Sequence, residues 1–468
     1  MVLSGLTFPR VFLRAALVLS CLLPLSILPA QTDNLAGTMP EHVLPELDAI
    51  LKTALQQSHQ AISAAIEIDR AEAARIQADS ARWPSLGANL NLANNQEAVS
   101  GNTSTQSRAS GLFYNIGLGQ SLFHWGALKN QSAIGRIGVL IAEKNFAEAY
   151  RSLSVLLRQT YLDLMIKKAR LQHGRYMFER AQSDLATLKA DPTRVSIAFI
   201  SGRELDLREA KLELDRSEVE FAAGLRRFAR LAGLDGGVLT EEKIADDLPR
   251  PTYTPAAASA ITARVLRERG AGSYEPQILA LRVREAEHRY DIEKVRLLPK
   301  FNAGAGYSLD NSSTVGTDRV EQQAITRQNV NITAQWNLFD GFATRAAKME
   351  ARSAQRLYQR RLSVAVEALL EQVQALERSL RLDAEHLDIS DARYAIAVEG
   401  KKRTTEESAL GQVAKADIER AEGNILISRA NVFTARAKFF ADWSEFVSIA
   451  GVDPVLQNLP NRHVREKR

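Results

Sequence analysis

Apolar residues alternate with small or polar ones in three stretches of the chain, residues 86–92, 112–119 and 330–338. A period of two residues predicts β-strands with one apolar face and one polar face. Stretches of about ten residues that are apolar outside and polar inside are typical of a membrane barrel. A soluble β-sandwich shows the same alternation, so this pattern alone leaves both architectures open.

Polar segments rich in serine, threonine, asparagine and glycine lie between the predicted strands, at residues 96–110 and 311–327. They show no apolar period and contain many turn-forming residues. We therefore predict that both are exposed loops at the extracellular tip of the strand pairs.

A helical period follows the strands. Residues 127–189 contain no proline, and apolar side chains recur at steps of three and four from Phe146 to Leu164. This spacing predicts a helix with one apolar face. About sixty helical residues rise roughly 95 Å, which exceeds a globular domain, so the helix must pack in a coiled-coil or tubular assembly. Residues 343–398 predict a second helix of this kind.

Each long helix is predicted to turn back into a further helix. Asp191, Pro192 and Thr193 form the first turn, and the helix after it runs to Leu231. Residues 399–411 form the second turn. The chain therefore contains two predicted helical hairpins, one after each strand pair.

A shorter helix is predicted before each strand pair, at residues 47–82 and 276–298. Pro84 and Pro299 end these helices, because proline cannot continue a helix. Every element of the first half thus has a counterpart in the second.

This order indicates an internal duplication. Three short motifs recur at nearly constant separation, centred on Pro84 and Pro299, Phe123 and Phe339, and Gly233 and Gly451. The predicted organisation is a signal peptide (1–30), a first repeat (31–240), a linker (241–272) expected around the middle of the tube, a second repeat (273–455) and a basic tail (456–468).

The first thirty residues predict a secretory signal. Arg10 and Arg14 precede an apolar run at 15–28, which ends before a small residue, Ala30. Cys21, the only cysteine, lies inside this run, and the sequence leaves open whether it is lipidated or removed with the signal. No later segment is apolar enough for a membrane helix, so any membrane crossing must use strands.

Aromatic residues gather near one end of the predicted strand pairs. They are Trp83, Phe123, Trp125, Trp336, Phe339 and Phe342. Aromatic rings at one level of a barrel are typical of the interfacial girdle of a membrane protein, and this is our prediction. Ordinary core aromatics are the alternative.

Four strands cannot close a barrel in a membrane, because edge strands would leave backbone groups unpaired in lipid. Bacterial barrels begin at about eight strands. A single chain is therefore incomplete, and a dimer or a trimer would satisfy the strand count.

The composition excludes several classes of function. The net charge is only +5 over 468 residues, and arginines alternate with acids along helical faces, so we expect no nucleic-acid partner. The seven histidines show no HxxxH or HExxH spacing, and neither a phosphate-binding loop nor a Gly-x-Ser-x-Gly motif occurs. We therefore predict no enzymatic activity, no cofactor and no metal site.

The signal peptide, the duplicated helix–strand–strand–helix–helix unit and the strand exit at residues 336–341 resemble the outer membrane efflux protein family of TolC-like export ducts. The likeness covers residues 47–453. The first strand exit departs from the family pattern, since His124 and Trp125 replace Asp-Gly.

The resemblance implies a mainly α fold with membrane β-strands: a homotrimer in the outer membrane, with a 12-stranded β-barrel and an α-helical tube in the periplasm. It implies a periplasmic adaptor protein and an inner-membrane transporter, ABC or proton-driven, as partners. The chain would be one subunit of a passive channel for efflux or type I protein secretion.

Residues 411–421 are similar to the family's helix return at the periplasmic tip, where two acidic residues narrow the entrance and bind cations. Asp417 matches the first position, but Arg420 stands at the second, and Phe199 is the counterpart of Asp417 in the first repeat. We hypothesise a mixed-charge entrance in which Asp417–Arg420 pairs replace a cation trap. A solvated acid–base pair without a gating role is the alternative.

The resemblance also implies that the helix tips dock the adaptor. The tip residues are Asp191, Pro192, Thr193, Leu410, Gly411 and Gln412.

Two other classes of protein compete with the duct. A periplasmic adaptor or scaffold would also use long helical hairpins, although it carries one hairpin with small β-modules rather than a duplicated strand pair. A coiled-coil structural protein leaves the strand pairs unexplained. The sequence names neither the exported cargo nor the partner transporter.

Overall fold

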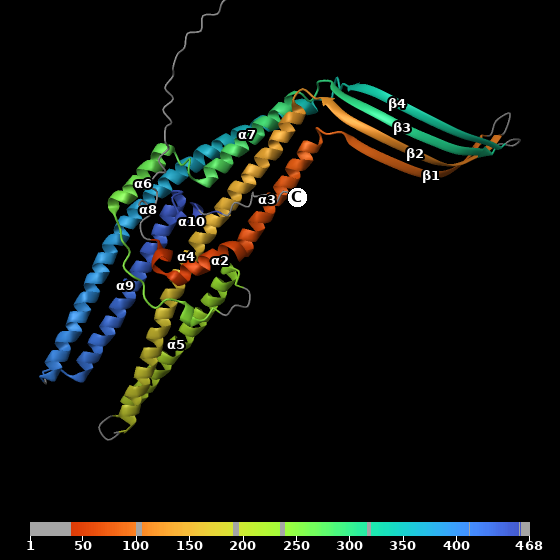
Figure 1. The fold of residues 1–468 in the computed structure, drawn as a ribbon. Helices are drawn as coiled ribbons and strands as arrows, with labels where there is room; N and C mark the ends of the chain where they lie inside the picture. The colour runs from red at the N-terminus through yellow and green to blue at the C-terminus, as the bar shows by residue number, and fades with distance from the viewer. Residues whose placement is uncertain are drawn as a thin grey trace, which may run out of the picture.

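The computed structural model describes residues 39–99, 105–190, 196–234, 239–315, 320–410, 412–457 and 459. One antiparallel sheet extends from one end of a body of long helices (Figure 1). The first half contains α1 Pro40–Val43, α2 Pro45–Gln57, α3 His59–Ser80, β1 Ser85–Val99, β2 Thr105–Phe123, α4 Ala127–Ala190 and α5 Ile197–Ala232. The second half contains η2 Glu241–Lys243, α6 Pro255–Glu268, α7 Tyr274–Lys294, β3 Lys300–Val315, β4 Val320–Gln335, α8 Ala343–Ala409, α9 Lys415–Ile449 and α10 Pro454–Gln457.

The four strands form a single sheet in the order β1-β2-β3-β4, and all neighbours are antiparallel. The first pair runs from Ser85 opposite Gly119 to Val99 opposite Thr105. β2 and β3 join the two repeats.

The prediction of loops at 96–110 and 311–327 is wrong over most of their length, because these residues continue the strands and their pairing. Ladder hydrogen bonds use backbone groups, so a polar composition does not prevent a strand from extending. Residues 100–104 and 316–319 lie outside the described part.

Two helical hairpins run away from the sheet, α4 with α5 and α8 with α9 (Figure 1). The predicted helix at 127–189 is confirmed, and α4 has 64 residues. The predicted turn at 399–411 is wrong, because α8 continues through Gly400 to Ala409. Packing against α9 supports this extension, with Lys401 Nζ 3.0 Å from Glu422 Oε1 across the hairpin.

The predicted first helix at 47–82 is two helices. The break falls at Ser58, whose backbone is extended and whose hydroxyl accepts a hydrogen bond from the backbone N–H of Ala61 at 3.2 Å. A serine in this position caps the start of α3 and satisfies one of its free donors.

Two hydrophobic clusters stabilise the helical body. The first draws mainly on α2, α4 and α5, with Tyr161 and Phe228 fully buried. The second draws on α6, α8 and α9, with Phe446 fully buried and Trp443 nearly so. Each cluster therefore belongs mainly to one hairpin. None of the described helices combines the length and the apolar content that a membrane crossing needs.

The segment 241–272 contains structure that the prediction of a linker did not include. Helix α6 packs against α8, with Ile261 buried. Before α6, Lys168 of α4 donates to the carbonyl of Ile244, and Arg436 of α9 donates to the carbonyl of Leu248 at 2.8 Å. The segment thus crosses from the first hairpin to the second.

Candidate functional site

The register of the sheet places apolar side chains on one face and small or polar ones on the other, as the alternation predicts. An apolar row across the strands is Leu86, Leu118, Ala305 and Val330, and the next row, on the opposite face, is Gly87, Gly117, Gly306 and Asn329. Leu86 is 74% exposed and Val330 is 87% exposed. A contiguous exposed apolar face of this kind marks a surface that contacts a membrane or another protein.

The two outer strands of the sheet, β1 and β4, each have one edge that pairs with no other described strand. Within the described strands, β1 pairs with β2 alone and β4 pairs with β3 alone. The two edge strands are 15 and 16 residues long. Long rows of unpaired N–H and C=O groups favour pairing with a further strand.

The turns from strand to helix use two consecutive residues in the left-handed region. In the first repeat these are Trp125 (φ 53°) and Gly126 (φ 84°), and in the second they are Gly341 (φ 64°) and Phe342 (φ 70°). The duplication has therefore kept the turn while exchanging the order of glycine and aromatic. A non-glycine residue at positive φ is strained, which indicates that each aromatic side chain is held in place by its surroundings.

Contacts between rings supply part of that support. Phe123 and Trp125 lie 5.0 Å apart between centroids, and Phe339 and Phe342 lie 5.5 Å apart, both edge to face. The Trp125 indole N–H donates to the carbonyl of Pro299 at 2.7 Å. These pairs occupy matching places in the two repeats.

All six residues predicted for the aromatic girdle have exposed side chains at this end of the sheet. They are Trp83, Phe123, Trp125, Trp336, Phe339 and Phe342. The structure therefore brings them to one level, and their role at a membrane interface stays a prediction.

The predicted entrance pair is formed. Arg420 Nη1 lies 2.8 Å from Asp417 Oδ1. The second carboxylate oxygen of Asp417 accepts a hydrogen bond from the backbone N–H of Ala414 at 3.3 Å. Asp417 thus also caps the start of α9, a function that the sequence analysis did not consider.

A second charged contact, near the start of α9, joins the two hairpins. Arg180 of α4 lies 2.7 Å from the Glu419 carboxylate of α9, and its guanidinium also donates to the Glu419 carbonyl at 3.3 Å. The residues are 239 positions apart, so no local sequence pattern indicates the pairing. Glu419 lies two positions after Asp417 in α9, so this contact brings Arg180 of α4 close to the Asp417–Arg420 pair.

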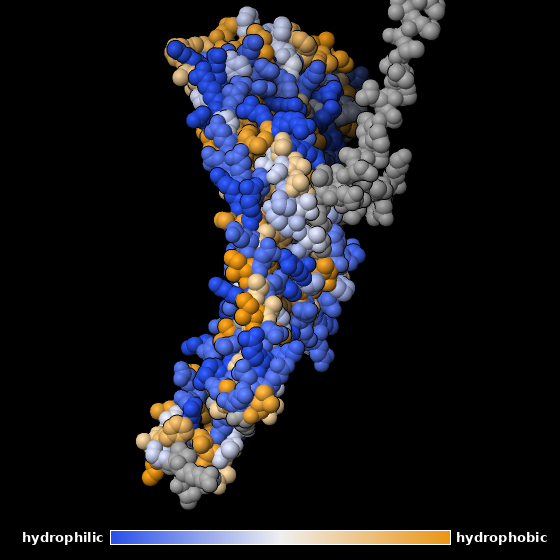
Figure 2. Space-filling model, turned by 90° about the vertical axis from the view of Figure 1, so that its left-hand side faces the viewer, coloured by the Kyte–Doolittle hydropathy of each residue, from blue (hydrophilic) through white to orange (hydrophobic). Residues whose placement is uncertain are grey.

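The helix tips are partly described. Leu410 follows the last turn of α8 and is 73% exposed, and the backbone N–H of Gln412 donates to the carbonyl of Glu407 at 3.0 Å. Asp191, Pro192, Thr193 and Gly411 lie outside the described residues, as do the predicted signal peptide with Cys21 and the end of the predicted basic tail. Seen from the side of α6 and α8, the helical surface is mostly hydrophilic with separate hydrophobic patches, some close to the tips (Figure 2).

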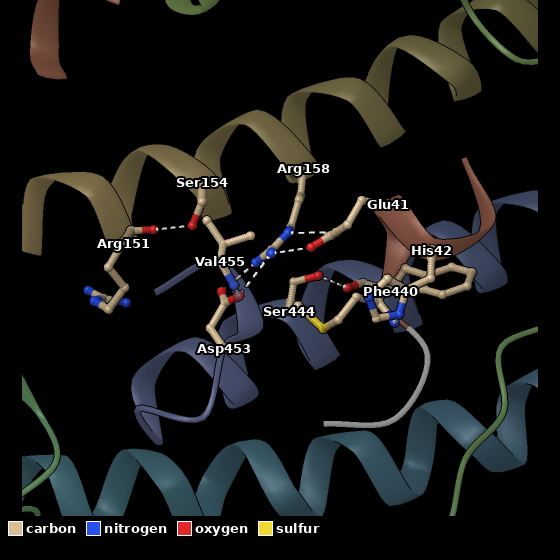
Figure 3. Close-up of polar contacts among 10 residues, drawn as sticks. Glu41, His42, Arg151, Ser154, Arg158, Phe440, Ser444, Asp453 and Val455 are labelled. Carbon is tan, nitrogen blue, oxygen red and sulfur yellow. Dashed lines mark hydrogen bonds and ion pairs between the residues drawn. The ribbon is translucent and has the colours of Figure 1, made fainter. Parts of the chain in front are cut away.

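A buried ionic network ties α1 and the segment after α9 to the middle of α4 (Figure 3). Arg158 donates to Glu41 at 3.0 Å and to Asp453 at 2.6 Å. Burial by itself lowers the pKa of the Arg158 guanidinium, but the hydrogen bonds and charges of Asp453 and Glu41 outweigh it and raise the pKa above its ordinary value. Arg158 lies next to the apolar residues that recur along α4. An arginine in that position could have indicated a buried acidic partner from the sequence.

The described residues contain no group of three or more histidine, cysteine, aspartate or glutamate side chains that could hold a metal ion. The ionic clusters found here are arginine or lysine paired with carboxylates. They fit structural and electrostatic roles along a helical assembly.

Comparison with known proteins assigns the chain to a family. The model of the outer membrane efflux protein family matches residues 50–191 and 276–451, one segment in each repeat. A comparison with curated protein sequences gave no match.

Solved structures share the fold at low sequence identity. The CmeC outer membrane channel of Campylobacter jejuni is 12% identical, with 96% of this chain and 94% of that chain covered and a TM-score of 0.68. The outer membrane protein VceC of Vibrio cholerae is 13% identical, with 87% and 96% covered and a TM-score of 0.63. The open state of the MtrE outer membrane channel of Neisseria gonorrhoeae is 14% identical, with 87% and 89% covered and a TM-score of 0.63.

The family match confirms the resemblance seen in the sequence and sets aside the adaptor and the coiled-coil structural protein. The family is one of channel proteins. The chain belongs to the outer membrane efflux protein family, and its fold is shared by solved outer membrane channels.

Proposed function

We propose that three copies of the chain assemble into one duct, with twelve strands in the outer membrane and a tube of helices in the periplasm. The observation that carries this proposal is the four-stranded sheet with two long open edges and an exposed apolar face. In lipid, each edge must pair with another strand. Three copies supply twelve strands, above the minimum of about eight for a bacterial barrel.

Exposed apolar residues on the helices support assembly below the membrane. They recur every seven residues on α5 and α8: Leu205, Leu212 and Val219, and Leu382, Ile389 and Ile396. A seven-residue spacing on an exposed face is the pattern of a helix that packs against a partner helix. We assign these stripes to contacts between neighbouring copies.

The cargo enters at the helix tips in this proposal. The tips would dock a periplasmic adaptor that connects the duct to an inner-membrane transporter, ABC or proton-driven, for efflux or type I secretion. The chain supplies a path, and the transporter supplies the energy.

Electrophoresis of the outer-membrane fraction tests the assembly. Unheated samples in mild detergent are expected to run as an oligomer of three chains that heating converts to a monomer. Adding charge to the apolar stripe, as in Leu212→Glu, should weaken the oligomer, whereas Lys211→Glu on the neighbouring position serves as the control. Recovery of the wild type as a soluble periplasmic monomer would contradict the proposal.

A further inference from the structure

A pocket of about 420 Å³ opens between α7 and α8 just beyond the end of β4. Apolar side chains form much of its lining, namely Leu297, Leu338, Phe339, Phe342 and Met349. Three cations on successive turns of α8 complete one side, Arg345, Lys348 and Arg352. The pocket thus combines an apolar surface with a basic rim.

The three cations have no ion pair or hydrogen bond within the described residues. Asp340 contributes the carboxylate in the lining, but its Oδ2 already accepts from the backbone N–H of Thr344 at 2.9 Å and from the Thr344 hydroxyl. The pocket therefore carries an excess of positive charge that no ion pair of the described residues neutralises.

At the corresponding place in the first repeat, a polar contact joins the two helices. Ser132, the counterpart of Lys348, donates to Asp79 of α3, and Asp79 also pairs with Arg75 at 2.9 Å. The counterpart of Asp79 in the second repeat is Lys294. The second repeat has thus replaced an internally paired acid with additional basic charge.

The residue at the helix contact differs between the repeats as well. At Gly135 of α4, an added Cβ would lie 3.0 Å from the Cβ of Ala78 and the Cα of Arg75, so α3 and α4 are in close contact there. The counterpart of Gly135 in α8 is Ala351. The glycine at this close contact of the first repeat is therefore not repeated in the second, where the pocket lies between α7 and α8.

The pocket continues the apolar face of the sheet. Ile332, Trp336 and Leu338 follow the alternation of that face and are all exposed, and Leu338 itself lines the pocket. An apolar face of a membrane strand contacts lipid tails, and the strand end lies at the level of the headgroups. Basic side chains at this level lie where lipid phosphates are.

We propose that this pocket binds an anionic phospholipid of the outer membrane's periplasmic leaflet. Its phosphate contacts Arg345, Lys348 and Arg352, and the first part of an acyl chain lies against Leu338 and Phe339. Guanidinium and ammonium groups form their strongest hydrogen bonds with such oxyanions. The aliphatic stems of the three cations cover apolar surface while their charged ends reach the headgroup.

Native mass spectrometry of the full-length protein in detergent tests the proposal. The probes are phosphatidylglycerol and phosphatidylcholine with identical acyl chains. The wild type is expected to bind phosphatidylglycerol about tenfold or more tightly, because the quaternary ammonium of phosphatidylcholine cancels the charge of its phosphate and is repelled by the three cations. The triple variant Arg345→Gln, Lys348→Gln, Arg352→Gln should lose this preference.

A matched control removes three cations of the same helix outside the pocket, Arg356→Gln, Arg360→Gln and Arg361→Gln, and should keep the preference. Lys348→Arg should also keep it. If the triple variant folds poorly, Met349→Trp fills the pocket, leaves the cations in place and should weaken binding of both lipids.

An unchanged preference in the triple variant would overturn the proposal. So would an oligomer that dissociates more easily while its lipid preference stays intact, because the cations would then pair with acids of a second copy. Lipid preference is measured per chain, so a failure of the threefold assembly is distinguishable from a failure of the lipid site.

Discussion

Arg158 Nη1 lies 2.6 Å from Asp453 Oδ2, and neither side chain is exposed to solvent. The two residues are 295 positions apart. The pair therefore joins the middle of α4 to the segment that follows α9, and Glu41 adds the N-terminal segment to the same contact. This network connects the first repeat to the end of the second.

Replacing Arg158 by methionine should destabilise the folded chain by about 3–5 kcal/mol, because two buried carboxylates would lose their cation. Thermal or denaturant unfolding measures the effect. The control is Glu67→Gln, which breaks an exposed pair with Arg70 and should change stability by less than about 1 kcal/mol. Similar losses in the two variants would show that the buried network contributes little.

The contact between Arg180 and Glu419 should restrain the two hairpins relative to each other near their tips. Arg180→Glu should place two carboxylates together and raise single-channel conductance in planar bilayers, because the hairpins would separate. The double variant Arg180→Glu, Glu419→Arg should return conductance to the wild-type level. Arg203→Glu, which affects a pair within α5, is the control. Failure of the double variant to restore conductance would contradict a direct contact.

The mixed-charge entrance makes a specific prediction about Asp417. If its carboxylates line the entrance, Asp417→Ala should weaken the block of the channel by multivalent cations added to the bath, as measured by single-channel recording. Arg420→Gln should strengthen that block, since it frees the carboxylate from its ion pair. Block that is the same in all three proteins would support a role limited to capping α9.

The pH dependence of the contact between Lys168 and Asp246 can be derived from its geometry. The hydrogen bond from the Lys168 ammonium, 2.7 Å away, lowers the pKa of the Asp246 carboxyl below its ordinary value of 3.8. The stabilisation is therefore complete above pH 3.8 and is lost as the pH falls through the lowered pKa. Asp246→Asn should lower the melting temperature slightly near pH 7, and this difference from wild type should shrink as the pH drops below 3.8. The aspartate is largely exposed, so the effect is below about 1 kcal/mol.

The glycines that end α5 and α9 should differ in how much stability is lost when alanine replaces them. Gly233 has φ +67°, and an added Cβ would lie 2.5 Å from the Gln57 carbonyl oxygen. At Gly451, with φ +71°, the nearest atom would be 3.0 Å away. Both alanine variants should be destabilised by at least about 1 kcal/mol, and Gly233→Ala by more. Gly138→Ala, in open space within α4, should be neutral or stabilising. Unfolding measurements on the three variants decide the order.

The structure reproduces the elements that periodicity predicts. The long helix at 127–189 and the alternation at 86–92 follow from side chains that repeat along the chain, and such patterns are local. The prediction of loops at 96–110 and 311–327 is wrong, because polar residues in a strand show no apolar alternation that could indicate it. Their extended conformation depends on a partner strand.

In the candidate site, too, local contacts could be predicted from the sequence and contacts between distant segments could not. The pair between Asp417 and Arg420 is three residues apart, so its formation could be expected from helix geometry. The contact of Arg180 with Glu419 could not, since it requires two hairpins to lie side by side. The basic pocket at Lys348 could not be expected from the sequence either, because its lining comes from residues of α7, α8 and the segments beside them that meet only in the fold.

The sequence by itself predicted the duplication and the need for assembly, and it determined the order of strands and helices and the family. These depend on composition and period, which are properties of the chain before it folds. The tertiary structure alone decided how far the strands extend, where segment 241–272 crosses the hairpins and which charges meet across them. Those features depend on backbone pairing and on contacts between residues hundreds of positions apart, and neither leaves a pattern in a single sequence.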